Sequence, residues 1–229
     1  MNQGKSWERE YRNPILMTGD DKPQSDTLHF LKYLKKVESA SWRNKIKNIL
    51  DLGSGTGRNS NYLAELDNNV IGIEISSTAL KTAKDRAQMA NIEVDYRLGD
   101  IGAPYDVADD SIDIILDITS SNSLDEKGRA IYLKEMHRVL KSGGYIFVRA
   151  LCKDGNANVK NLLKNSPGKE YDTYYIKEMD LTERVFSRKD IIDMYSKYFQ
   201  ILKLEKKTSY PKMDGRIYKR DYWLMYLKK

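Results

Sequence analysis

The chain has 229 residues, of which 40% are apolar and 31% charged, with a formal net charge of +6. These values fit one domain spanning 1–229, and no apolar run approaches the roughly 20 residues that a membrane span needs. The polar N-terminus lacks a signal peptide's apolar region, and the single cysteine, Cys152, excludes an internal disulfide. We therefore expect a cytoplasmic protein without membrane contact.

Residues 1–45 are predicted to form an N-terminal helical cap. A short helical turn is expected over 7–11, before Asn13 and Pro14, and would place Trp7 and Tyr11 on one face. An amphipathic helix is expected over 24–39. Its predicted inward side chains are Leu28, Leu31, Leu34, Tyr33 and Val37.

Strand and helix patterns alternate through the rest of the chain. Strands are predicted over 47–52, 70–75, 94–98, 112–118, 145–151, 199–206 and 222–227, and helices over 59–66, 76–89, 125–140 and 187–198. This alternation predicts an α/β fold, a mostly parallel sheet with helices on both faces. The last two strands should pair antiparallel, because the loop with Pro211 and Gly215 is too short for a crossover helix.

The segment between the fifth strand and the helix at 187–198 has no clean period. It is rich in Asn, Lys and Tyr, and we interpret residues 153–184 as an insertion. Before the fifth strand, Lys141, Ser142, Gly143 and Gly144 are expected to end the preceding helix.

The most informative motif lies between the first two strands. Asp51 precedes Gly53, Gly55 and Gly57, and the second strand ends in Glu74. Glycine suits such a turn because it adopts positive φ and lets a ligand approach the backbone. An acid at the tip of the second strand can accept hydrogen bonds from both hydroxyls of a ribose. The unit is therefore typical of nucleoside binding.

The spacing of the glycines separates two classes of nucleoside-binding turn. Dinucleotide-binding turns read GxGxxG, which would require glycine at Arg58. The DxGxGxG pattern present here resembles the class I S-adenosylmethionine (SAM)-dependent methyltransferases, and the resemblance extends over residues 46–229. It implies a doubly wound, Rossmann-like seven-stranded sheet with strand order 3-2-1-4-5-7-6 and strand 7 antiparallel. The alternative, a glycine turn in an unrelated α/β protein, stays open.

The resemblance also implies roles for individual positions around SAM or its product, S-adenosylhomocysteine. Asp51 would orient the amino group of the cofactor, and the turn of Gly53, Ser54, Gly55 and Gly57 would receive its methionine part. Arg58 and Asn59 open the next helix, whose N-terminal amides favour an anion such as the cofactor carboxylate.

The remaining implied contacts follow the ends of later strands. Glu74 would accept from the ribose hydroxyls, and Ile75 would lie against the adenine. Asp100 and Ile101 would bind the adenine edge, and Asp117, Ile118 and Thr119 would border the methionine end. Relatives fold an N-terminal segment over the cofactor, so Tyr11 or Trp7 is expected to close the site.

The sequence identifies no catalytic residue and predicts no metal site. Methyl transfer depends mainly on alignment, and a general base is needed only for an acceptor with a high pKa. The positions after the fourth strand read Asp117, Ile118, Thr119 and Ser120, without the proline motif of base-amine methylation. Cys152 lacks the context of a cytosine-methylating cysteine. The segment 120–123 should border the methyl group, and it could equally serve as a helix-cap loop. Relatives place a substrate cover at the position of 153–184, where Tyr171, Tyr174 and Tyr175 either form a pocket wall or pack against the edge of the sheet.

The methyl acceptor is expected to be a small molecule that accepts at N, O or S. RNA is the first alternative, because residues 1–50 and 151–229 carry net charges of +4 and +7 around a central region of −5. The best candidate RNA patch is 203–220, with Tyr210 and Tyr218. The second alternative is a SAM-binding or S-adenosylhomocysteine-binding protein without catalysis. A monomer and a homodimer are both compatible with the sequence.

Overall fold

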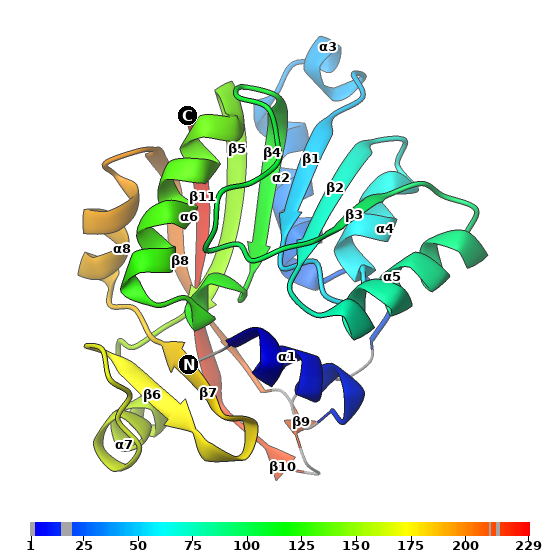
Figure 1. Ribbon diagram of the computed structural model, residues 1–229. Helices are drawn as coiled ribbons and strands as arrows, with labels where there is room; N and C mark the ends of the chain where they lie inside the picture. Colours follow the sequence, from blue (N-terminus) through cyan, green and yellow to red (C-terminus); the bar gives the residue numbers. More distant parts are fainter. Residues whose placement is uncertain (1–2, 15–19, 211, 214–215) are drawn as a thin grey trace.

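The computed structural model describes residues 3–14, 20–210, 212–213 and 216–229. Seven of the described strands form one sheet in the order β3-β2-β1-β4-β5-β11-β8. β11 is antiparallel to both of its neighbours, and the other pairs are parallel (Figure 1). The predicted fold class and strand order are therefore confirmed. The seven strands are β1 (Asn48–Leu52), β2 (Asn69–Glu74), β3 (Asp95–Leu98), β4 (Ile112–Ile118), β5 (Leu140–Leu151), β8 (Gln200–Ser209) and β11 (Arg220–Lys228).

Helices cover both faces of this sheet. On one face, α6 (Glu126–Val139) and α8 (Arg188–Tyr195) pack with Leu50 and Leu52 of β1 in one apolar core. On the other face, α2 (Ser25–Val37) and α4 (Arg58–Ala64) pack with Ile49 of the same strand. Successive side chains of a strand point to opposite faces, so one apolar strand serves both cores. The remaining helices are α1 (Gln3–Arg12), α3 (Ala40–Arg43), α5 (Ser77–Met89), α7 (Ala157–Asn165) and the 3₁₀ turns η1 (Ser121–Ser123) and η2 (Lys177–Met179).

The inward face of α2 differs from the prediction at its ends. Phe30 and Leu34 are its buried apolar side chains, whereas Val37 is 51% exposed. Val37 is the last residue of the helix and lies beyond the part that packs on the sheet. Leu31 and Tyr33 are partly buried against the same core. Phe30 was missed, although it stacks on Phe147 with the ring centroids 5.3 Å apart.

β5 begins five residues before its predicted start. Leu140 pairs with Ile112 of β4, and the pairing then shifts register before Tyr145. Gly143 adopts a φ of 80° within this irregular part of the strand. The helix α6 ends at Val139, before residues 141–144 as predicted, and passes directly into β5. The predicted loop residues Pro211 and Gly215 lie outside the described residues.

The segment predicted as an insertion, 153–184, forms structure of its own at the carboxyl ends of the strands. It contains α7 and a hairpin of β6 (Thr173–Ile176) and β7 (Leu181–Arg184). The helix α1 lies across the same end of the sheet and contacts α5, η2 and β7 (Figure 1). Two short strands, β9 (Lys212–Met213) and β10 (Arg216–Ile217), form a separate antiparallel pair.

Candidate functional site

A cavity of about 1250 Å³ lies at the carboxyl ends of β1, β2 and β4. Ligands of doubly wound sheets bind at this edge, where the strand order reverses. Twelve of the fifteen predicted site residues line it: Tyr11, Gly53, Ser54, Gly55, Arg58, Asn59, Glu74, Ile75, Asp100, Ile101, Ile118 and Thr119. Asp51, Gly57 and Asp117 do not. Positions separated by up to 108 residues therefore meet around one space.

The glycine turn is tightly enclosed. Gly53, Gly55 and Gly57 have φ values of 71°, 56° and 83°, which favour glycine. A Cβ atom at Gly53 would stand 2.1 Å from the Ser120 hydroxyl oxygen, and one at Gly55 would stand 2.7 Å from the Tyr11 hydroxyl oxygen. The turn thus brings bare backbone to the cavity wall. The buried hydroxyl of Ser54 on the same wall has no hydrogen-bond partner, so the turn presents both backbone and an unused polar group.

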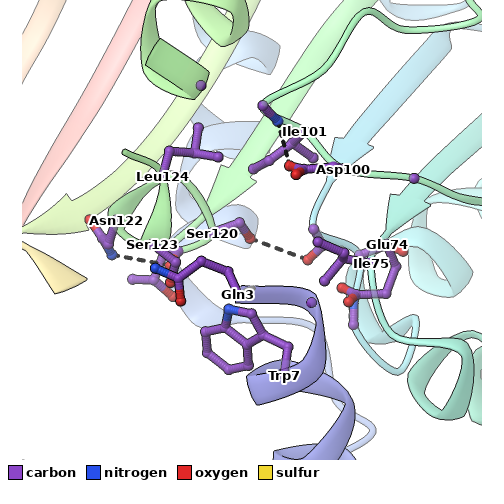
Figure 2. A pocket seen from close by; sticks show the side chains of 18 of the residues that line it. Gln3, Trp7, Glu74, Ile75, Asp100, Ile101, Ser120, Asn122, Ser123 and Leu124 are labelled. Carbon is purple, nitrogen blue, oxygen red and sulfur yellow. Dashed lines mark hydrogen bonds between the residues drawn. The ribbon is translucent and has the colours of Figure 1, made fainter. Parts of the chain in front are cut away.

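Glu74 stands at the end of β2 with its carboxylate at the cavity (Figure 2). The side chain is 4% exposed, and it accepts hydrogen bonds from the amides of Gly55 at 2.9 Å and Ser76 at 2.8 Å. Burial raises the pKa of this carboxyl group, although the two hydrogen bonds act to lower it. A carboxylate offers about four lone-pair sites, so two acceptor positions remain for hydroxyl groups in the cavity.

Asp100 and Ile101 follow β3 and line the cavity on the same side as Glu74 and Ile75 (Figure 2). Asp100 is exposed and accepts a hydrogen bond from the Gly102 amide at 2.7 Å, which fixes the loop. Ile75 lies beside Glu74 on the same wall. A carboxylate and two apolar side chains therefore surround this part of the cavity, a combination that suits a planar heterocycle with an amino group.

The loop after β4 forms the wall opposite Glu74. Thr119 has a φ of 66°, which costs a threonine about 1–3 kcal/mol and is common at functional sites. The Ser120 hydroxyl donates to the carbonyl of Gly53 at 3.3 Å (Figure 2). Asn122 is held by the Thr119 carbonyl and the Leu151 amide. In the predicted segment 120–123, Ser121 is the one residue that does not line the cavity.

The two central acids, Asp51 and Asp117, lie behind the cavity wall. Asp117 accepts hydrogen bonds from the Tyr132 hydroxyl at 2.7 Å and the Ser120 amide at 2.8 Å, and burial raises its pKa. Asp51 is 1% exposed and accepts from the Ser60 hydroxyl at 2.6 Å. Burial, opposed by Ser60 and reinforced by Asp117, raises the pKa of Asp51 to about 6. Both carboxyl groups therefore stabilise the cavity wall from behind and do not contact the cavity.

The raised pKa of Asp51 predicts a pH-dependent effect of Asp51→Asn. Because the folded-state pKa of about 6 exceeds the unfolded value of about 3.8, ionisation of Asp51 opposes folding increasingly as the pH rises between these values. The free energy of unfolding of the variant, relative to wild type, should therefore increase by up to about 3 kcal/mol from pH 4 to pH 8. Urea unfolding at the two pH values measures this, and a pH-independent difference would contradict the assignment.

The helix α1 forms the roof of the cavity. Gln3 and Trp7 face the loop after β4 in Figure 2, and Tyr11 also lines the space. Glu8, on the other side of the helix, accepts from the hydroxyls of Ser76 at 2.7 Å and Thr78 at 2.6 Å. Burial acts to raise the pKa of Glu8, but these hydrogen bonds outweigh it and lower that pKa to about 2. Glu8 could not be found from local sequence patterns, because its partners Ser76 and Thr78 are about 70 residues away.

Glu8 is therefore expected to hold α1 in place. Glu8→Ala should increase hydrogen–deuterium exchange of the amides of 3–12 several-fold at neutral pH, because α1 loses its bonds to the start of α5. Arg12→Ala is the control, since it removes only the exposed ion pair that Arg12 makes with Glu8. Equal exchange in both variants would show that other contacts hold α1.

Of the two alternatives for the tyrosines of the insertion, the pocket wall is not formed. Tyr174 is buried and donates to Glu183 at 2.6 Å, Tyr175 donates to Asp180 at 2.9 Å, and Tyr171 is 74% exposed. None of the three lines the cavity. The segment contributes polar and charged side chains instead: Lys169, Glu170, Thr173, Thr182 and Arg184. Alternation along β6 and β7 decides which side chains face the cavity, and the irregular sequence did not reveal these strands.

Among the described residues, no three His, Cys, Asp or Glu side chains gather as metal ligands. Within the same residues, no helix combines the length and apolar character needed to cross a bilayer.

Comparison with known proteins places the chain among methyltransferases. The family model described as a methyltransferase domain matches residues 43–205. An uncharacterized methyltransferase of Schizosaccharomyces pombe is 25% identical over 114 residues, which cover 50% of this chain and 78% of that protein. The ubiquinone biosynthesis O-methyltransferase of Pelagibacter ubique is 27% identical over 140 residues, 59% of this chain and about half (53%) of that protein. A SAM-dependent methyltransferase structure from Methanosarcina mazei matches 84% of this chain and 98% of its own, with a TM-score of 0.69 and 21% identity.

Proposed function

The chain belongs to the methyltransferase domain family and is a SAM-dependent methyltransferase, and we propose that it methylates a nitrogen, oxygen or sulfur atom of a small molecule. The observation that carries the proposal is the roof over the cavity. Trp7 and Gln3 of α1 face the loop after β4, and the β6–β7 hairpin adds further lining. A covered space excludes water and suits a small ligand that must be held in line.

Two observations support a fit between the residues around the cavity and SAM. The glycine turn is tightly enclosed, and the buried hydroxyl of Ser54 has no partner in the protein. Glu74 would accept hydrogen bonds from the ribose hydroxyls, and the glycine turn with Arg58 would hold the methionine part. Asp100, Ile75 and the Ile101 amide would hold the adenine. When bound, SAM supplies an electrophilic methyl group on a sulfonium. Asp51 and Asp117, behind the wall, would keep the loops of the turn and of β4 in place.

Two basic side chains of the candidate RNA patch, Lys206 and Lys207, pair with buried acids. Lys207 pairs with the buried Asp26, and Lys206 donates to the Asp154 carbonyl at 2.6 Å and lies 3.4 Å from Asp221. A lysine that compensates a buried acid is less available to a phosphate. This favours the small-molecule acceptor. The absence of a metal, the cytoplasmic location and the monomeric or dimeric state stay predictions.

Transfer of a labelled methyl group tests the proposal. Wild-type protein, labelled SAM and either a metabolite extract or total RNA should give label in the metabolite fraction and none in RNA. Glu74→Ala is the control for a reaction at this site. Label confined to RNA would contradict a small-molecule acceptor. Binding of S-adenosylhomocysteine without transfer to either pool would favour the alternative of a protein without catalysis.

A further inference from the structure

One end of the cavity is formed by η1, the start of α6 and the β6–β7 hairpin, away from Glu74. Its charged lining residues are Asp125, Lys127, Lys169, Glu170 and Arg184. The strand β7 contacts η1 directly, so Arg184 and the serines after β4 belong to the same part of the molecule. This end, which the proposed cofactor contacts do not use, is the natural place for the methyl acceptor.

Both acids at this end accept a hydrogen bond from the first turn of α6, although the Oε2 atom of Glu170 is buried without a partner. Asp125 is the N-cap of α6 and accepts from the Gly128 amide at 2.7 Å. One carboxylate oxygen of Glu170 accepts from the Glu126 amide at 2.9 Å in the same first turn. The partial positive charge of a helix N-terminus stabilises both carboxylates. The helix N-terminus therefore compensates part of their charge, and both acids also act to raise the pKa of the nearby Arg129.

The basic groups lack comparable partners. The Nε atom of Arg184 is buried without a hydrogen-bond partner. Arg129, 4% exposed behind the cavity, donates to the Leu124 carbonyl through one nitrogen, while its Nε and a second terminal nitrogen have no partner. Both guanidinium groups lie against Phe186, at 5.3 Å for Arg184 and 5.5 Å for Arg129 from the ring centroid. Burial and the neighbouring Arg184 lower the pKa of Arg129 to about 10.

Two guanidinium groups on one buried ring keep unused donors at low dielectric. Together with Lys127 and Lys169 they outnumber the two acids, so positive charge is in excess at this end of the cavity. The hydroxyl of Ser123 adds a donor on the cavity wall, because its side chain is 6% exposed and its oxygen has no partner. A carboxylate or phosphate group can accept several such hydrogen bonds at once, and arginine binds both groups through two parallel donors.

We propose that the methyl acceptor carries an anionic group, a carboxylate or a phosphate monoester, that binds Arg184 and Ser123. Arg129 acts as a positioning residue that adds positive charge from behind Phe186. Lys127 and Lys169 add further positive charge at the same end. This inference rests on the proposed function, since it names the substrate class for that site. The accepting atom then lies nearer Ser120, toward the cofactor end.

The test uses three small probes with the full chain saturated with S-adenosylhomocysteine: benzoate, phenyl phosphate and the neutral benzamide. Nuclear magnetic resonance of the arginine Nε–H groups reports binding at Arg184 directly. At least one anion should bind at least about tenfold more tightly than benzamide, as charge-assisted hydrogen bonds require. The stronger of the two anions identifies the group as carboxylate or phosphate.

Arg184→Gln should remove the preference for anions over benzamide, whereas Arg188→Gln, an exposed arginine outside the cavity, should retain it. Arg129→Gln should weaken the anion less than Arg184→Gln does. All three variants should bind S-adenosylhomocysteine with the wild-type affinity, which also shows that they are folded. No anion preference in the wild type, or an equal preference in Arg184→Gln, would overturn the inference. Failure of wild-type protein to bind S-adenosylhomocysteine would instead refute the proposed function.

Discussion

Glu74→Ala is expected to weaken the binding of S-adenosylhomocysteine by at least about tenfold. Hydrogen bonds to a charged group contribute about 1.5–3 kcal/mol each, and tenfold corresponds to about 1.4 kcal/mol. The binding free energy lost with the carboxylate therefore exceeds about 1.4 kcal/mol even if Glu74 holds only one ribose hydroxyl. Isothermal titration calorimetry measures the change.

A control is needed because Glu74 also accepts hydrogen bonds from two backbone amides. Alanine leaves the Gly55 and Ser76 amides without their carboxylate partner, so part of the loss could come from the loops. Glu74→Gln keeps one acceptor oxygen for these amides and removes the charge. It should retain the wild-type free energy of unfolding more closely than alanine does and still bind less tightly than wild type. Wild-type affinity in both variants would place the ribose elsewhere.

Gly57→Ala is expected to lower the free energy of unfolding by about 2–5 kcal/mol. Part of this loss is backbone strain, because Gly57 has a φ of 83°, which costs other residues about 1–3 kcal/mol. The rest is a clash with the packing between α4, α5 and β3. A Cβ atom would stand 2.3 Å from the Tyr96 hydroxyl oxygen and 2.9 Å from the Cβ of Ala83. Urea unfolding measures the sum of both effects.

Gly143→Ala is the matched control, since Gly143 has a φ of 80° but no atom lies within 4 Å of the added Cβ. This variant isolates the backbone strain. Its loss of unfolding free energy should be smaller than that of Gly57→Ala by at least about 1 kcal/mol. Equal losses in the two variants would mean that the contact with Tyr96 and Ala83 relaxes freely. The comparison also explains why Gly57, which does not line the cavity, is still needed for the turn.

Local signals predicted the central part of the molecule well. The glycine turn, the acid at the tip of β2 and the alternation of strands with helices depend on short stretches of sequence. Family resemblance then supplied the strand order. The same resemblance supplied the twelve cavity residues. All of them except Tyr11 lie at or after the ends of neighbouring parallel strands, which must meet at one edge of the sheet.

The parts that the sequence did not reveal depend on contacts between distant residues. Val37 has the right helical spacing but lies past the sheet, and Leu140 enters β5 only because Ile112 offers it a partner. The site's roof depends on Glu8 reaching Thr78. Arg129 and Arg184 resemble ordinary surface arginines in sequence and become notable only through their shared contact with Phe186.

Calorimetry with three ligands tests the central claim, that the cavity at Glu74 is a SAM site. SAM and S-adenosylhomocysteine should each bind the wild-type protein with micromolar affinity, which is about −8 kcal/mol, and NAD should bind far more weakly. The turn carries Arg58 where a dinucleotide-binding turn requires glycine. Tight binding of NAD with no heat from either SAM or S-adenosylhomocysteine would contradict the account.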